Sequence, residues 1–185
     1  MGSRIGSEND TQSSMSMNAI PQSQTVRDAF SVKVGDTRIG RKLHVGSEEF
    51  SVKISSRDTN RAFAVLAGLV APNGGPPLHR HLYQDEWFYI VDGQFLFESD
   101  GKNIYAGTGD TVLLPHGSSH TLQNVGSTPG RTVVTVVPGG IDLFFEELSV
   151  ALPPGVEPDP AKLGGLFQKH GLELLGPPVS KRKAA

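Results

Sequence analysis

Residues 74–93 read GGPPLHRHLYQDEWFYIVDG, and this stretch decides which fold we expect. Successive side chains of an extended strand point to opposite faces, so His79 and His81 face the same way and can share a metal ion. Glu86 has the wrong parity to join them along an unbroken strand. The polar residues 83–85 permit a turn, however, and that turn would bring Glu86 back on the next strand.

A second stretch, residues 109–124, reads GDTVLLPHGSSHTLQN. Its pattern predicts a strand, a tight turn at Pro115 and Gly117, and a further strand that begins with His120. Two histidines on the surface of a β-protein are unremarkable by themselves. A third imidazole that is aimed inward from a neighbouring strand favours a metal site.

The chain from residue 30 to residue 137 has the pattern of an all-β fold. Short runs rich in β-branched and aromatic residues recur at intervals of about eight to twelve residues, as in a sandwich or barrel. Asp-Gly pairs at Asp92–Gly93 and Asp100–Gly101 predict two hairpins, because glycine tolerates the positive φ of such turns. The expected strands are Phe30–Val34, Ile39–Val45, Phe50–Ser55, Phe63–Val70, Glu86–Val91, Gln94–Glu98, Asn103–Ala106, Thr111–Leu114, His120–Gln123 and Thr132–Val137.

The sequence predicts three regions. Residues 1–28 are polar and lack periodicity, which is typical of a disordered leader, and Met15 and Met17 leave open whether all of it is native. Residues 29–140 are expected to form the β-barrel, and residues 141–185 a helical segment and tail.

Two short helices are expected in the third region. Asp142 is expected to cap a helix that ends near Leu148. A second helix is expected from Asp159, with Pro160 in its first turn, to about Gly171. Residues 176–178 and the basic tail after them are expected to be extended or frayed.

Composition excludes several classes of protein. The chain has no cysteine, which excludes disulfides, thiolate ligands and cysteine nucleophiles, so a metal must be held by His, Asp or Glu. Its 17 Lys and Arg against 19 Asp and Glu give a formal net charge of −2, far from the basic footprint of a nucleic-acid-binding protein. No run is long enough to span a bilayer, and the first 25 residues do not read as a signal peptide. We therefore expect a cytoplasmic protein with neither a nucleic-acid nor a membrane partner.

The two histidine-bearing stretches resemble the paired motifs of the cupin superfamily. The second stretch has all five fixed residues of its motif at the usual spacing: Gly109, Pro115, Gly117, His120 and Asn124. The first stretch has four: His79, His81, Glu86 and Gly93. Its one departure is that four residues, where five are usual, separate Gly74 from His79, which changes a loop and no ligand. The resemblance covers about Phe50 to Val137 and implies a single antiparallel β-barrel of the cupin, or jelly-roll, type with a metal near its centre.

By the pattern of that superfamily, the metal ligands would be His79, His81, Glu86 and His120. Three imidazoles and a carboxylate suit one divalent first-row transition metal per chain, namely Fe, Mn, Ni, Co, Cu or Zn. Strand parity also places three apolar residues on the inner face: Phe88, Ile90 and Leu122. They would either line a substrate pocket or belong to the ordinary core. Gln123 and Asn124 could hydrogen-bond a ligand imidazole, and turn chemistry explains Asn124 equally well.

The runs GGPPLHRHLYQDEWFYIVDGQFLF and GDTVLLPHGSSHTLQNVG are similar to small, single-domain bacterial cupins related to quercetin dioxygenase. That resemblance implies a metal-dependent dioxygenase that cleaves an aromatic or enolic, flavonol-like small molecule with O2. Glu86 would be the base for the substrate hydroxyl, and the chain would form a homodimer. Two alternatives stay open. One is an oxygen-independent metal enzyme, such as an isomerase, decarboxylase or dehydratase, and the other is a non-catalytic cupin that binds a small molecule.

Overall fold

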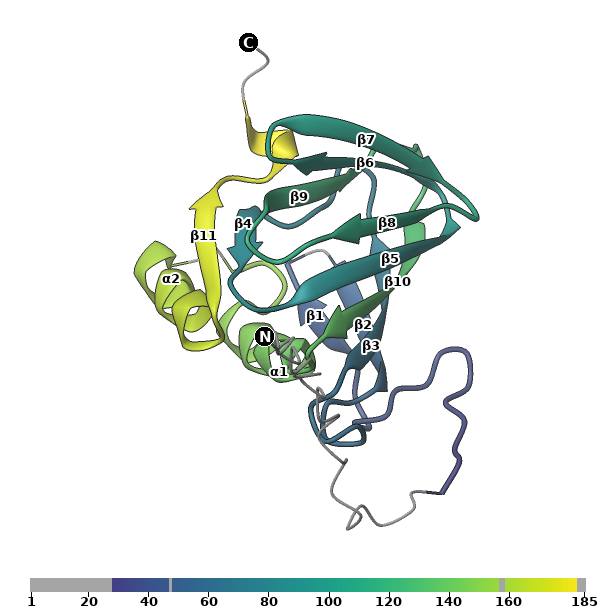
Figure 1. Cartoon of the computed structure of the whole chain (residues 1–185). Helices are drawn as coiled ribbons and strands as arrows, with labels where there is room; N and C mark the ends of the chain where they lie inside the picture. The colour runs from purple at the N-terminus through teal and green to yellow at the C-terminus, as the bar shows by residue number, and fades with distance from the viewer. Residues whose placement is uncertain (1–27, 47, 157–158, 183–185) are drawn as a thin grey trace, which may run out of the picture. The chain divides into compact units, whose positions relative to one another are not determined.

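The computed structural model describes residues 28–46, 48–156 and 159–182, and within these ranges eleven strands form two antiparallel sheets (Figure 1). The first sheet contains, in order across it, β1 (Leu43–Val45), β2 (Glu48–Ile54), β3 (Ala64–Val70), β10 (Gly130–Val137), β5 (Asp85–Asp92) and β8 (Thr111–Leu114). The second contains β11 (Leu172–Gly176), β4 (Leu78–His81), β9 (Ser119–Asn124), β6 (Gln94–Ser99) and β7 (Lys102–Gly107). The two sheets are not closed into one continuous barrel, and they have the jelly-roll arrangement that the sequence predicts.

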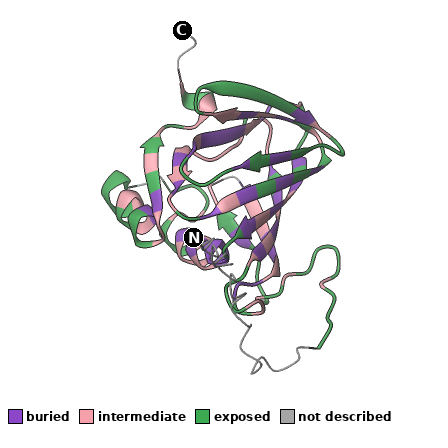
Figure 2. Cartoon of the chain, viewed as in Figure 1, coloured by how far each residue is buried: buried purple, intermediate pink, exposed green. Residues whose placement is uncertain are grey.

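The core lies between the inner faces of the two sheets. In β5, Phe88 and Ile90 are buried while Trp87 and Tyr89 are exposed, as the two-residue period of a strand requires (Figure 2). The Phe88 ring lies 5.2 Å from the ring of Phe97 on the opposite sheet, so aromatic side chains join the two layers. The parity predicted for β5 is therefore confirmed.

Three of the sequence-based expectations for the strands are wrong. Residues 30–34 form no strand, and the strand expected over residues 39–45 is reduced to β1. The Asp100–Gly101 hairpin joins the paired strands β6 and β7, but at Asp92–Gly93 the chain crosses from one sheet to the other. An Asp-Gly pair signals a local turn and carries no information on whether the flanking strands pair. Residues 1–27 of the expected leader lie outside the described residues.

Strand β11 was not predicted from the sequence. It pairs with β4, with Leu172 opposite His81 and Leu174 opposite His79 (Figure 1). Its partner is about ninety residues earlier in the chain, so no local pattern announces the pairing.

The two expected helices are present as α1 (Ile141–Ala151) and α2 (Pro160–Lys169), and a short 3-10 helix, η1 (Val179–Lys181), follows β11. Asp159 caps α2 as predicted, because its carboxylate accepts hydrogen bonds from the backbone N–H groups of Ala161 and Lys162. Helix α1 begins after Gly140, which provides no side-chain cap. None of the helices in the described ranges is long and apolar enough to cross a bilayer.

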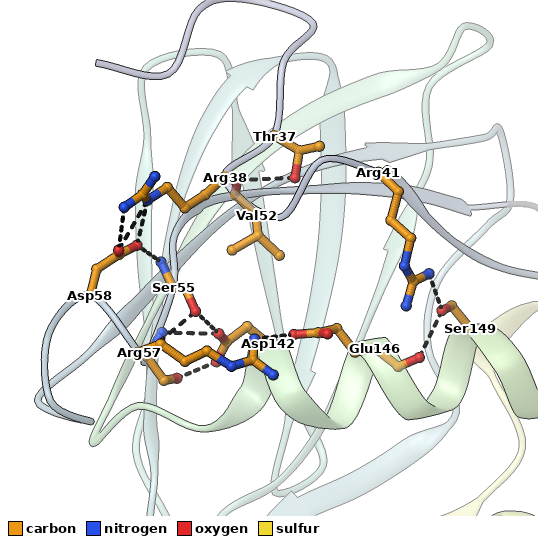
Figure 3. A network of polar contacts seen from close by, with 11 residues as sticks. Thr37, Arg38, Arg41, Val52, Ser55, Arg57, Asp58, Asp142, Glu146 and Ser149 are labelled. Carbon is orange, nitrogen blue, oxygen red and sulfur yellow. Dashed lines mark hydrogen bonds and ion pairs between the residues drawn. The ribbon is translucent and has the colours of Figure 1, made fainter. Parts of the chain in front are cut away.

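Asp142 anchors α1 to the β-sandwich, a different role from the predicted cap. It is fully buried, and its carboxylate accepts hydrogen bonds from the Ser55 hydroxyl at 2.7 Å, from the Ser56 backbone N–H at 2.9 Å and from the Ser56 hydroxyl (Figure 3). Both serines lie in the loop between β2 and β3. A carboxylate at the start of a helix also faces the positive end of the helix dipole. The first turn of α1 is therefore fixed to the sheet.

Glu48 makes the stability of the fold depend on pH. Burial raises the pKa of this carboxyl from 4.5 to about 7, against the hydrogen bond from the Gly75 backbone N–H, which lowers it. The pKa of Glu48 is higher in the folded than in the unfolded protein. The contribution of Glu48 to the unfolding free energy is therefore complete below pH 4.5 and is lost as the pH rises through 7. We expect the unfolding free energy of the wild type, relative to Glu48→Gln, to fall by about 2 kcal/mol between pH 5 and pH 8. Urea titrations at the two pH values measure this difference, and a difference that stays constant with pH would contradict it.

Candidate metal centre

Three strands bring the four predicted ligands together on the inner faces of the two sheets. His79 and His81 lie on β4, two residues apart and on one face, and His120 lies opposite His79 in the register between β4 and β9. Glu86 comes from β5 in the other sheet. A bend at residues 82–84 separates β4 from β5, as the polar linker predicted, and it carries the chain across to that sheet.

The four side chains converge closely. One ligand atom from each residue, an imidazole nitrogen or a carboxylate oxygen, lies within 4.8 Å of all the others. The Nε2 atoms of His81 and His120 are each 3.4 Å from a different oxygen of Glu86. The ring centroids of His79 and His120 are 4.5 Å apart. The arrangement is compact enough for one ion to contact all four residues.

The outer nitrogen of each imidazole has a partner that sets its orientation. Nδ1 of His79 lies 2.8 Å from the Pro77 carbonyl oxygen. Nδ1 of His120 lies 3.1 Å from the Ser118 carbonyl oxygen. Because a carbonyl oxygen only accepts, both Nδ1 atoms carry the proton, and the lone pair is left on Nε2.

Gln84 sets the orientation of the His81 ring, and this role of Gln84 was not predicted from the sequence. Its Oε1 lies 3.1 Å from Nδ1 of His81, and its Nε2 donates to the Pro138 carbonyl oxygen at 3.0 Å. Gln123 and Asn124 were the expected partners of a ligand imidazole. Asn124 instead donates to the carbonyl oxygens of Val70 and Thr128 and accepts from a backbone N–H. It therefore holds loops in place.

The electrostatics of the cluster favour a neutral His79 imidazole beside an ionised Glu86 carboxylate. Burial, together with the neighbouring His120 and His81, lowers the pKa of His79 to about 3. Burial alone would raise the pKa of the Glu86 carboxyl, but the imidazoles of His81 and His120 outweigh it and lower this pKa to about 2. His79 and Glu86 therefore offer free lone pairs to a metal ion at neutral pH.

Two buried nitrogen atoms support the fit of a metal to this cluster. In the described part of the chain, Nε2 of His81 and Nε2 of His120 are buried without a hydrogen-bond partner. An unpaired buried polar atom is costly, and a bound cation would satisfy both lone pairs. Three nitrogen donors and one carboxylate oxygen are a donor set that first-row transition metals accept. The cluster could thus hold such an ion through His79, His81, Glu86 and His120.

We expect Gln84→Leu to weaken metal binding by about tenfold to a hundredfold, because the hydrogen bond that fixes the His81 ring is lost. The affinity is measured by competition with a chelator of known strength. Gln123→Leu is the matched control, since no hydrogen bond joins the Gln123 side chain to a ligand imidazole. Equal affinities of the two variants would contradict the role of Gln84.

The remaining candidate residues lie around the centre. Phe88, Ile90 and Leu122 face inward, and each is less than a tenth exposed. His116 is exposed, as expected for a turn residue, and its ring lies 2.7 Å from an oxygen of Asp85. Phe167 of α2 was not predicted. Its ring packs edge-on against His79, with the centroids 6.2 Å apart, and only the tertiary structure reveals this contact.

Comparison with known proteins places this site in a family. Residues 68–137 match the family model described as "Cupin domain". An uncharacterized protein of Methanocaldococcus jannaschii is 32% identical over 65 residues, which are 35% of this chain and 52% of that protein. A quercetin 2,3-dioxygenase of Bacillus subtilis is 28% identical over 110 residues, which are 59% of this chain and 32% of that protein. An oxalate-binding protein of Thermotoga maritima is 29% identical over 98 residues, which are 53% of this chain and 79% of that protein. The chain thus spans about half of the first relative and a third of the second.

Solved structures have the same fold. KdgF from Halomonas sp. superposes with a TM-score of 0.54 at 15% identity, covering 63% of this chain and 99% of that one. A predicted oxalate decarboxylase from Thermotoga maritima superposes with a TM-score of 0.54 at 19% identity, covering 60% of this chain and 99% of that one. The match of residues 68–137 to the cupin domain model agrees with the two sequence motifs, and the solved structures show that the fold is of the cupin type.

Proposed function

We propose that the chain is a metal-dependent dioxygenase that cleaves an aromatic or enolic, flavonol-like substrate with O2. The observation that carries this proposal is the buried cluster of three imidazoles and one carboxylate with two unpartnered Nε2 atoms. The likeness to a protein named quercetin 2,3-dioxygenase adds support. One divalent ion of Fe, Mn, Ni, Co, Cu or Zn bound there would act as a Lewis acid toward the substrate oxyanion and O2.

In this proposal Glu86 is the catalytic base. Its carboxylate is ionised at neutral pH and lies among apolar inner-face residues, where it can accept the proton of an acidic enol hydroxyl. Phe88 and Leu122 would exclude water and pack against the aromatic rings of the substrate. Both oxygen atoms of O2 would enter the product, with carbon monoxide released from the opened ring.

The test loads separate samples of the protein with each candidate metal and measures oxygen consumption with a panel of flavonols and related enols. With at least one metal, we expect the protein to consume one molecule of O2 for each molecule of flavonol consumed. The metal-free protein should consume no O2. No uptake with any metal and any substrate would contradict it. Turnover under strict anaerobiosis would instead favour an isomerase, decarboxylase or dehydratase.

A second candidate is a binding protein that holds a small carboxylate at the same metal. The observation that favours it is the likeness to a protein named oxalate-binding protein, of which the alignment covers 79%. Calorimetric titration of the metal-loaded chain with oxalate distinguishes the two functions. Binding without any chemical change, together with no reaction of flavonols, would favour the binding protein.

We further propose that the chain forms a homodimer through the outer face of the first sheet. Trp87, Tyr89 and Leu113 lie side by side on β5 and β8 and are between 40% and 60% exposed. Large exposed apolar patches of this kind are typical of protein–protein interfaces. Light scattering at micromolar concentration is expected to give twice the chain mass, and a monomer would contradict the proposal.

A further inference from the structure

The candidate metal centre is closed to solvent. The side chains of its four ligands belong to residues that are only 1–8% exposed. These residues offer little surface to a substrate of the size of a flavonol, so motion of a neighbouring element would increase access to them. Access to the ligands therefore depends on which neighbouring element is held most weakly.

Phe167 stands at the boundary between the ligands and the C-terminal helices. It is 4% exposed, and its ring packs edge-on against His79 on one side and against Phe144 of α1 on the other, at a centroid distance of 5.0 Å. Within the described residues of α2, Phe167 is the one buried side chain. Leu163 and Leu166 of α2 are partly buried and also pack against the core, but Phe167 is the residue that covers His79.

The sequence of α2 makes it a weak helix. Gly164 and Gly165 lie in its middle, and a Cβ atom added at either position would meet nothing within 4 Å. No close approach requires glycine there, while glycine in a helix interior is less favourable than alanine. The helix is mostly exposed, as Figure 2 shows.

The elements on either side of α2 are held more firmly. Helix α1 has three buried apolar residues and the buried Asp142 anchor (Figure 3), and β11 is paired along β4. The polar links between α1 and α2 are the contacts of Lys169 and His170 with Glu147, at a partly exposed position where ion pairs contribute little. Gly171, with φ +72°, follows the C-cap His170, and its backbone is held by hydrogen bonds to Gln168 and Leu82. Helix α2 has fewer fully buried residues than α1 and lacks the strand pairing of β11, so it is the most weakly held of the three elements.

We propose that α2 is a lid over the metal centre and that Phe167 is its gating residue, whose side chain determines what can reach the face of His79. This inference rests on one part of the proposed function, namely that the four candidate ligands bind a metal. The lid itself is a property of the chain without metal.

Release of Co²⁺ to 4-(2-pyridylazo)resorcinol tests the gate, because this aromatic chelator must reach the metal in the same way as an aromatic substrate. We expect Phe167→Ala to accelerate release by about tenfold or more, since the covering ring is removed. We expect the double variant Gly164→Ala/Gly165→Ala to slow release by about tenfold, since it favours the closed helix. Phe145→Ala is the matched control, because Phe145 packs at a tilt against Phe50 with no ring contact to a ligand, and it should release the metal at the wild-type rate.

Release rates within twofold of wild type in both the Phe167 and the glycine variants would overturn the gate. The glycine variant keeps the test decisive if Phe167→Ala fails to fold. Hydrogen exchange of the metal-free protein separates the lid from the metal proposal. We expect amides of α2 to exchange about a hundredfold faster than those of β9, and equal protection of the two would overturn the lid. If the wild type takes up no Co²⁺, the metal proposal fails while the exchange result still decides on the lid.

Discussion

His120→Ala will lower the metal affinity of the protein more than about a hundredfold, since even partners outside the ligand set change affinity by 10–100-fold. The variant loses one of three nitrogen ligands and leaves Glu86 with one fewer neighbouring imidazole. His120 is 1% exposed, so water replaces the lost ligand poorly. Elemental analysis after dialysis against a weak chelator should find about one ion per wild-type chain and almost none per variant chain.

His116→Ala is the control for this experiment. It removes the same side chain from an exposed turn only four residues away, where the imidazole contacts Asp85 and none of the ligands. The control should retain the wild-type metal content. Equal metal content in the His120 variant and the wild type would refute the candidate centre.

Asp142→Ala will destabilise the fold by about 3 kcal/mol, because a buried carboxylate with three hydrogen bonds is removed. The hydroxyls of Ser55 and Ser56, which are 3% and 1% exposed, would remain in the interior without their acceptor. Helix α1 would lose its attachment to the loop between β2 and β3. Urea-induced unfolding followed by circular dichroism measures the loss.

Glu146→Ala, one turn further along α1, provides the comparison. Glu146 pairs with Arg57 at a position where the arginine side chain is 59% exposed, so the expected loss is below about 1 kcal/mol. If the two variants unfold at the same urea concentration, Asp142 is not the anchor that its contacts indicate.

The set of four candidate ligands was predictable because the two sequence motifs resemble those of the cupin superfamily, and part of its geometry is local. Strand parity alone places His79 and His81 on the same face of the strand. The Pro-x-Gly pattern at Pro115 and Gly117 predicts the turn before His120. Gln84 and Phe167 were missed for the opposite reason. Gln84 reaches His81 only because the chain bends after β4, and Phe167 reaches His79 from a helix almost ninety residues later.

The fold shows the same division between local and distant causes. Alternation predicted most strands, and Asp159 with Pro160 predicted the start of α2. Asp142 was assigned as a cap because sequence shows a polar residue before an apolar run, whereas its partners come from a loop far away in the chain. Pairing partners, and therefore β11 and the crossing at Asp92–Gly93, are decided by the packing of the two sheets.

An anomalous difference map of crystals loaded with one metal, recorded at the absorption edge of that metal, tests the candidate metal centre most directly. We expect a single peak per chain within bonding distance of His79, His81, Glu86 and His120. No peak between these four side chains, or a peak elsewhere in the protein, would contradict it.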